Sequence, residues 1–156
     1  MTPPRTRRAP ARTLGAPLTR AEMDAQTAAA MHESVLQGRV AGLCKQFGVR
    51  HYHTHDSRRS TSGWPDSAMV GVGGFMVREL KREREKPTPA QQAWLDDLIA
   101  AGINAGVWRP SDLISGRIQT EIAALAGREQ EGRRLTTAMD ITRAMLARHR
   151  NQGDTP

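Results

Sequence analysis

The sequence from Gly63 to Lys81, GWPDSAMVGVGGFMVRELK, decides the fold of this protein. Apolar runs on both sides of a glycine pair predict two short strands joined by a hairpin turn. Gly73 and Gly74 can adopt the positive φ angles that a tight hairpin turn demands. The first strand begins at an aspartate and the second ends in Glu-x-Lys, so the hairpin also carries the main candidate chemistry.

The position of the turn determines which polar side chains lie opposite one another. A turn on Val72-Gly73 places Asp66 opposite Glu79. A turn on Gly73-Gly74 places Asp66 opposite Lys81, with Glu79 diagonal to it. Cross-strand Cβ atoms are about 5 Å apart when opposite and about 7–8 Å apart when diagonal. Because side chains alternate between the two faces of a strand, either register brings all three groups onto one face.

Two carboxylates and an ammonium on one sheet face form a candidate metal site. Hard cations such as Mg²⁺ take oxygen ligands and keep several waters. Phosphodiester cleavage uses such a metal to polarise the phosphate and to activate water. The alternative interpretation is an edge hairpin that carries solvated charges.

Composition limits the classes of protein that the sequence can encode. The 156 residues suffice for one compact domain with tails, and 38% hydrophobic residues allow only a modest core. A single cysteine excludes a disulfide within one chain and fits a reducing, cytoplasmic compartment. No apolar run approaches the ~20 residues of a membrane span, so we expect no membrane partner. The net charge of +7 suits a polyanionic substrate, although a merely soluble basic protein has the same charge.

The remaining sequence predicts helices and strands around the hairpin. We expect a disordered basic arm over residues 1–18, one domain over 19–127, and a C-terminal helix and tail over 128–156. Within the domain the expected elements are helices over 19–47, 88–101 and 111–127, and strands over 49–55 and 103–108. A weaker amphipathic helix over about 133–148 has no evident partner, since it could dock on the domain, pair two subunits or face nucleic acid.

Two polar residues on predicted helices point toward the hairpin. Glu33 lies three residues before Leu36, near the buried edge of the first helix, where a carboxylate costs free energy unless it is paired or metal-bound. It is either a third acidic group of the site or an ordinary boundary glutamate. Gln91 lies one turn before Trp94 and Leu95, on the helix edge that faces the sheet.

Three histidines alternate onto one face of the strand over residues 49–55. His51, His53 and His55 could bind zinc, together with Cys44. Their spacing fits no usual zinc module, and the other interpretation is a polar strand face with one or two histidines near a substrate.

A polar loop over residues 56–62 precedes the hairpin. The side chains of Arg58, Arg59 and Ser60 could grip phosphates, since guanidinium and hydroxyl groups are common phosphate contacts. A plain surface loop is the alternative.

The order helix, strand, strand, strand, helix, strand, helix, with these polar residues, resembles the PD-(D/E)xK nuclease superfamily. It is most similar to the VRR-NUC family in its small stand-alone phage and bacterial form. The likeness covers roughly Glu33 to Leu125 and is carried by Glu33-x-x-x-Gln37, residues 56–60, Gly63-Trp64-Pro65-Asp66, Arg78-Glu79-Leu80-Lys81, Thr88-Pro89-x-Gln91-x-x-Trp94 and Gly106-Val107-Trp108-Arg109-Pro110.

The resemblance implies an α/β restriction-endonuclease-like core, with a mixed central sheet flanked by helices, and a metal-dependent DNA nuclease. Asp66, Glu79 and the carbonyl of Leu80 would bind Mg²⁺ or Mn²⁺, and Glu33 would join directly or through a water. Lys81 would orient the attacking water or stabilise charge on the phosphate, since it lies two residues from Glu79. Gln91 would support the site from the helix over residues 88–101.

The resemblance also implies the substrate and the assembly. Stand-alone members of the family are associated with branched DNA and Holliday junctions and tend to be homodimers, in bacteria or phage-infected cells. The residues expected to contact DNA are Arg58, Arg59, Ser60 and Arg109. One departure is Ser67-Ala68, where the family commonly has a larger aliphatic residue. The competing hypotheses are a non-catalytic or zinc-stabilised DNA-binding protein with a nuclease-like fold, and an RNA substrate.

Overall fold

The computed structural model describes residues 17–54, 61–128 and 139 of the chain. Its centre is a four-stranded mixed sheet in the order β1-β2-β3-β4. The strands are β1 (Arg50–His53), β2 (Ser67–Gly71), β3 (Gly74–Leu80) and β4 (Asn104–Trp108). Strand β2 runs antiparallel to both β1 and β3, and β4 runs parallel to β3.

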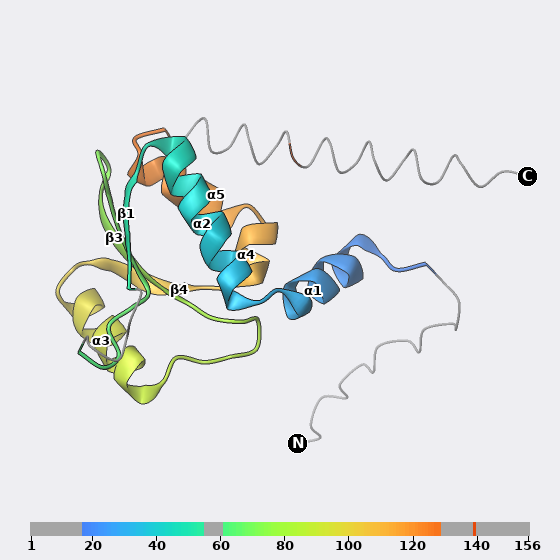
Figure 1. The fold of residues 1–156 in the computed structure, drawn as a ribbon, viewed down its shortest axis with the longest axis horizontal. Helices are drawn as coiled ribbons and strands as arrows, with labels where there is room; N and C mark the ends of the chain where they lie inside the picture. Colours follow the sequence, from blue (N-terminus) through green and yellow to red (C-terminus); the bar gives the residue numbers. More distant parts are fainter. Residues whose placement is uncertain (1–16, 55–60, 129–138, 140–156) are drawn as a thin grey trace, which may run out of the picture.

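Helices cover both faces of this sheet (Figure 1). One face packs against α2 (Glu33–Phe47) and α5 (Arg117–Leu125), and the other face packs against α3 (Pro89–Ala100). Two further helices, α1 (Arg20–Ala30) and α4 (Pro110–Ile114), lie against each other beside α2. The predicted α/β class, with a mixed sheet flanked by helices, is therefore confirmed.

The core lies between α2, α5 and the sheet face that they cover. The apolar residues predicted to form a stripe on the first long helix supply one side of it, because their helical spacing places them on one face. The fully buried residues of this core include Leu36, Val40, Cys44, Phe47, Met69, Met76, Leu80, Trp108, Ile118 and Ile122.

The observed register decides between the two predicted turns. Gly71 pairs with Gly74, so the turn falls on Val72-Gly73. The same register pairs Ser67 with Arg78, and the next residues along the two strands are Asp66 and Glu79. Asp66 therefore lies opposite Glu79, as the first of the two predicted registers requires.

The two turn glycines are needed for different reasons. Gly74 has the positive φ of 125°, whereas Gly73 does not have a positive φ. Gly73 is instead required by close packing: a Cβ on it would lie 2.4 Å from the carbonyl oxygen of Ala124. Its N–H donates to the carbonyl of Leu125 at 2.8 Å, so the hairpin turn packs against the end of α5. Of the two glycines that could adopt a positive φ, only Gly74 does so.

This packing predicts opposite effects of alanine at two glycines. Gly73→Ala is expected to cost about 1–3 kcal/mol of unfolding free energy, because α5 must shift to admit the methyl group. Gly38→Ala in α2 is the matched control: nothing lies within 4 Å of its added Cβ, and the better helix propensity of alanine should stabilise by up to about 1 kcal/mol. Urea unfolding followed by circular dichroism measures both. A Gly73→Ala protein as stable as the wild type would contradict the contact with α5.

The predicted helix over residues 19–47 is two helices. Thr19 and Glu22 form the expected capping box at the start of α1. Met31 and His32 are extended, and α2 begins at Glu33. The chain turns here because α1 packs on α4 whereas α2 packs on the sheet, and one straight helix cannot do both. Glu33 thereby lies in the first turn of α2, where unpaired backbone N–H groups favour a carboxylate.

The predicted helix over residues 111–127 is also divided. Gly116, with a φ of 83°, separates α4 from α5. The N-cap of α4 is Arg109 rather than Ser111, and its N–H is accepted by the Asp112 carboxylate at 2.8 Å. By contrast, α3 begins at Thr88-Pro89, as predicted.

Two predicted parts of the chain fall largely outside the described residues. They are the basic arm over 1–18, of which only residues 17 and 18 are described, and the helix over about 133–148, of which only Met139 is described. Among the helices of the described part, none has the length and apolarity needed to cross a bilayer.

Candidate active site

Asp66 is held between β1 and β3, at the point where the chain enters β2. Its Oδ2 accepts the backbone N–H of Leu80 at 2.8 Å. Its backbone carbonyl accepts the N–H of Thr54 at 3.1 Å and lies 2.9 Å from Nδ1 of His53. Since a carbonyl only accepts, Nδ1 of His53 carries the proton in this contact. These contacts fix the Asp66 carboxylate beside the end of β3.

The segment that leads into Asp66 is anchored on α3. The rings of Trp64 and Trp94 meet edge to face, with centroids 5.0 Å apart. Nε1 of Trp94 donates to the carbonyl of Ser62 at 3.3 Å. The tryptophan of the predicted α3 motif therefore positions the loop before the aspartate.

Glu79 is a fully buried acid at the end of β3. Its side chain is 0% exposed, and the Lys81 ammonium lies 2.5 Å from Oε1. In the described structure Oε1 has this ion pair as its polar contact, and Oε2 has no hydrogen-bond partner. Burial raises the pKa of Glu79 to about 7; the Lys81 ammonium opposes this rise, and the nearby Asp66 carboxylate adds to it. A buried carboxylate with an unpartnered oxygen is costly, and each such group calls for an explanation.

Lys81 is a buried cation among acids. Burial by itself lowers the pKa of an ammonium, but the carboxylates of Glu79, Glu33 and Asp66 outweigh that effect and raise the pKa of Lys81. The side chain is 12% exposed, so its charge is little screened by solvent. Lys81 is therefore protonated at neutral pH.

Glu33 completes a group of four charged side chains. Burial raises its pKa, Lys81 lowers it, and Asp66 raises it further. These interactions place the Glu33 carboxylate within electrostatic range of both. Glu33 of α2, Asp66 before β2, and Glu79 and Lys81 at the end of β3 therefore interact electrostatically; that they converge on one metal ion stays a prediction.

The backbone carbonyl of Leu80 points toward β2, the strand that Asp66 precedes. The N–H of Lys81 donates to Trp108 of β4 at 3.1 Å. Backbone groups of successive residues in a strand point to opposite sides, so both groups of Leu80 point toward β2. The bond from the Leu80 N–H to Asp66 agrees with this direction. The Leu80 carbonyl therefore lies on the same side of β3 as the Asp66 carboxylate, but no set of three or more His, Cys, Asp or Glu side chains in the described part could hold a metal ion.

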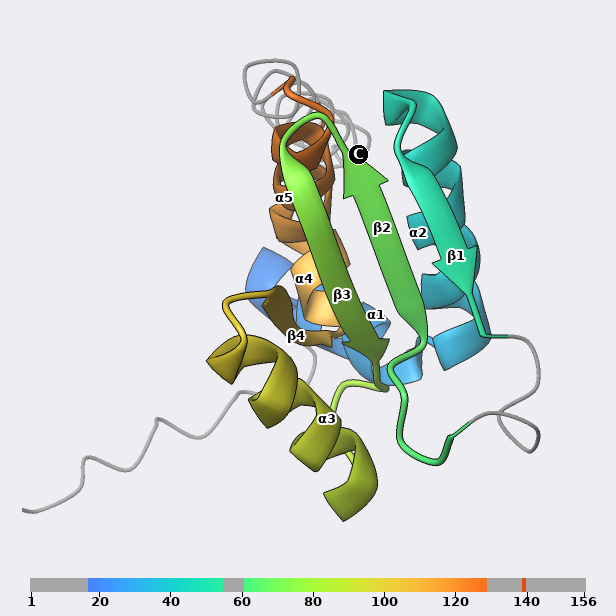
Figure 2. The same ribbon diagram turned by 90° about the vertical axis from the view of Figure 1, so that its left-hand side faces the viewer.

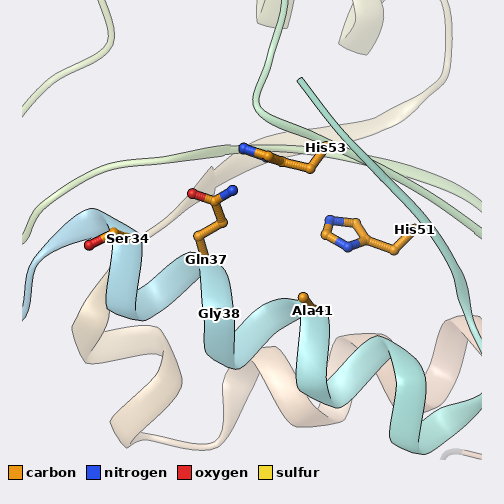
Figure 3. Close-up of a pocket in the computed structure, with 6 residues that line it drawn as sticks. All are labelled: Ser34, Gln37, Gly38, Ala41, His51 and His53. Carbon is orange, nitrogen blue, oxygen red and sulfur yellow. The ribbon is translucent and has the colours of Figure 1, made fainter. Parts of the chain in front are cut away.

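A cleft of about 470 Å³ opens between α2 and β1 (Figure 3). In Figure 3 the amide of Gln37 and the ring of His53 point toward one another across it. Gln37 lies one helical turn after Glu33, and His53 contacts Asp66, so the cleft adjoins the four charged groups. The complete lining is Ser34, Gln37, Gly38, Ala41, His51 and His53.

His51 and His53 share a face of β1, as predicted, but Cys44, the cysteine of the zinc hypothesis, lies in the core. The rings of His51 and His53 have centroids 6.5 Å apart, and Nε2 of His51 lies 3.2 Å from Oγ of Ser67. Cys44 is 1% exposed within the apolar core, and burial raises the pKa of its thiol to about 11. Cys44 packs within the apolar core cluster, and among the described residues no set of three or more His, Cys, Asp or Glu side chains could hold a metal ion. His55 lies outside the described residues.

This burial predicts an unreactive thiol. The native protein at pH 8 is expected to leave Cys44 unmodified by a disulfide reagent such as dithionitrobenzoate, because the thiol is both buried and protonated. Protein unfolded in guanidinium should release one equivalent of chromophore per chain, which serves as the control. Rapid reaction of the native protein would contradict the core position of Cys44.

Two other predicted site residues have structural contacts. Oε1 of Gln91 accepts the N–H of Thr88 at 2.9 Å, because the two residues form the capping box of α3. That oxygen is committed to starting the helix, so the contact that the structure gives Gln91 is a cap of α3, and its role in the site stays a prediction. Nη2 of Arg109 donates to the carbonyl of Glu85 at 3.0 Å, which ties the loop after β3 to the start of α4.

Some predicted and some unpredicted residues remain to be placed. The predicted phosphate contacts Arg58, Arg59 and Ser60 lie outside the described residues. The prediction for the hairpin did not assign a role to Arg78, which is buried and donates to Glu121 at 2.8 Å while lying 5.1 Å from the Trp108 ring centroid. Arg78 thereby ties β3 to β4 and α5. The sequence did carry a signal for this role: Arg78 directly precedes Glu79 in the strand, so its side chain must point to the other face of the sheet.

The fold and the site define an α/β protein with a buried acid–lysine group at one end of a mixed sheet. No protein-family model, curated protein or solved structure matches the chain.

Proposed function

We propose that this protein is a Mg²⁺- or Mn²⁺-dependent DNA endonuclease with a restriction-endonuclease-like core of the VRR-NUC type. The observation that carries the proposal is the buried carboxylate of Glu79. Its Oε1 is ion-paired with the Lys81 ammonium, its Oε2 has no hydrogen-bond partner in the described structure, and the Asp66 carboxylate is close enough to raise its pKa. A fold tolerates such a group when a ligand completes it, and active sites are where such groups cluster.

The donor set fits a hard divalent cation. Mg²⁺ is usually bound through one or two carboxylates together with waters and substrate phosphates. Asp66 and Glu79 would provide the carboxylates, and Leu80 would provide a carbonyl. Because no group of three acidic or histidine side chains in the described part could hold a metal, Glu33 would act through a water. When bound, the cation polarises the phosphate and activates water for hydrolysis.

The protein's own groups complete the chemistry. Lys81 keeps its proton, so it serves as a donor and a positive charge toward the phosphate and not as a general base. Positive charge held in place near the phosphate stabilises the negative charge that develops in the transition state. The burial of Glu79 and Lys81 keeps solvent from screening these interactions.

The substrate and setting are part of the proposal. The net charge of +7 favours a polyanion, and the resemblance favours DNA, branched or in Holliday junctions, cut by a homodimer in the cytoplasm of a bacterial or phage-infected cell. One observation favours a second candidate, a non-catalytic DNA-binding module: the described part has no three-residue metal group. The zinc-stabilised form of this alternative is weakened by the burial of Cys44.

Purified protein should be incubated with supercoiled, linear, flapped and four-way-junction DNA, and with a matched RNA, in Mg²⁺, Mn²⁺ or EDTA. We expect cleavage of branched DNA in either metal and none in EDTA. Cleavage that persists in EDTA would reject the proposed site. DNA binding without cleavage of any substrate would favour the non-catalytic module.

A further inference from the structure

One face of the sheet leaves large apolar side chains uncovered. Figure 2 looks onto this face: α3 lies in front of the lower part of the sheet, and no helix of the described part lies in front of β1 and β2. Tyr52 is 61% exposed, Val70 45% and Phe75 43%. Single exposed apolar residues are ordinary, but three on neighbouring strands form a surface that indicates a binding site.

The strand register places these side chains in rows across the sheet. Arg50 pairs with Val70, which pairs with Phe75. Tyr52 pairs with Ala68 in the next row. Because each row is two residues further along the strand, the rows are about 7 Å apart.

The row after that of Tyr52 contains the proposed catalytic acids. The N–H of Thr54 donates to the carbonyl of Asp66, which continues the pairing of β1 with β2. Asp66 in turn lies opposite Glu79. Tyr52 is therefore the diagonal neighbour of Asp66, about 7–8 Å away, which is comparable to the separation of successive nucleotides in an extended strand, and Glu79 lies one strand further across the sheet.

Chemistry selects the occupant of this surface. Tyr52 and Phe75 offer aromatic faces, and the exposed Arg50 adds a positive charge in the same row as Phe75. Unpaired bases have aromatic faces and are joined by phosphates, so an aromatic surface with basic residues suits them. Bases inside a duplex are already stacked on one another and cannot use such a surface. The net charge of +7 favours the same occupant.

We propose that Tyr52, Phe75 and Arg50 form a stacking surface for unpaired nucleotides next to the scissile phosphate. This inference rests on the proposed nuclease function and refines it: the substrate is DNA with single-stranded nucleotides beside the cleavage point, such as a flap or an open junction. A fully paired duplex lacks the unpaired bases that this surface binds.

Binding measured in EDTA separates this surface from catalysis. Fluorescence anisotropy of labelled oligo(dT) should show an affinity lower by about 5–150-fold for Tyr52→Ala, since stacking contributes about 1–3 kcal/mol per base. Tyr52→Trp should retain the affinity, and Arg50→Ala should weaken oligo(dT) binding and reduce its salt dependence. Val35→Ala is the control, because Val35 is 48% exposed but lies on α2, behind the sheet. Circular dichroism checks that each variant is folded.

The chain contains one tyrosine, which allows a direct test of its environment. Nitration by tetranitromethane should modify Tyr52 in the free protein and should be slowed by oligo(dT) but not by a blunt duplex. Protection that depends on protein concentration and not on DNA would overturn the proposal in favour of a subunit interface.

The outcomes distinguish the two proposals. If Tyr52→Ala binds oligo(dT) and cleaves branched DNA like the wild type, the stacking surface is wrong and the nuclease stands. If the wild type cleaves no substrate, but the Tyr52→Ala variant binds oligo(dT) more weakly than the wild type, the stacking surface stands and the nuclease falls.

Discussion

Glu79→Gln is expected to abolish DNA cleavage and, in the absence of metal, to make the protein more stable at neutral pH. The folded protein holds the Glu79 proton with a pKa of about 7, against an ordinary value of 4.5. The folded state therefore binds this proton more tightly than the unfolded state. The resulting stabilisation is full below about pH 4.5 and is lost as the pH rises through 7.

The size of the effect follows from the shift. One pKa unit corresponds to about 1.4 kcal/mol, so ionising Glu79 costs the metal-free fold at most about 3 kcal/mol. Glutamine carries no charge and removes this cost. Urea unfolding in EDTA at pH 5 and pH 8 should show a loss of stability for the wild type that Glu79→Gln lacks. Asp97→Asn makes the same change of charge at an exposed position and should follow the wild type.

Added metal gives a second measure of the same site. Mg²⁺ should raise the unfolding free energy of the wild type at pH 8 and leave that of Glu79→Gln unchanged, because a ligand that binds only the folded state stabilises it. Parallel pH profiles for the two proteins, with no effect of Mg²⁺ on either, would mean that Glu79 is not the metal-binding acid.

Lys81→Ala is expected to slow cleavage by about 10²–10³-fold, the usual cost of removing one group that stabilises transition-state charge. Asp66→Asn should also remove cleavage while the fold persists, because the amide oxygen of asparagine can still accept the N–H of Leu80. Single-turnover rates on a flapped substrate in saturating Mg²⁺ measure both, and anisotropy in EDTA reports DNA binding.

The matched control for Lys81 is Lys86→Ala. Lys86 is exposed in the charged run after β3, so the same loss of charge there should change the rate by less than about twofold. If Lys81→Ala and Asp66→Asn cleave within a few fold of the wild type, the acid–lysine group is structural and the catalytic centre lies elsewhere.

Several features of the site follow from local pattern. Alternation along two strands places Asp66, Glu79 and Lys81 together whichever turn the hairpin uses. The start of α3 at Thr88-Pro89 and the apolar stripe of α2 likewise follow from spacing within one helix. These predictions succeed because each depends on residues a few positions apart.

Other features are invisible to local pattern. Nothing such as glycine or proline at Met31 or His32 marks the end of α1, and the break depends on the packing of α1 against α4. The choice of turn depends on α5, whose end leaves room only for a glycine at position 73. The prediction of one continuous helix over residues 111–127 overlooked Gly116, because the apolar spacing continues past it.

Residue types and their spacing were thus enough to indicate a hairpin with two acids and a lysine on one face, and an α/β chain around it. Long-range packing alone buries Glu79, leaves its Oε2 without a hydrogen bond and brings Glu33 into electrostatic range. It also places Cys44 in the apolar core. The reason is physical: periodicity sets the direction of a side chain, whereas burial and charge environment depend on elements far apart in the chain.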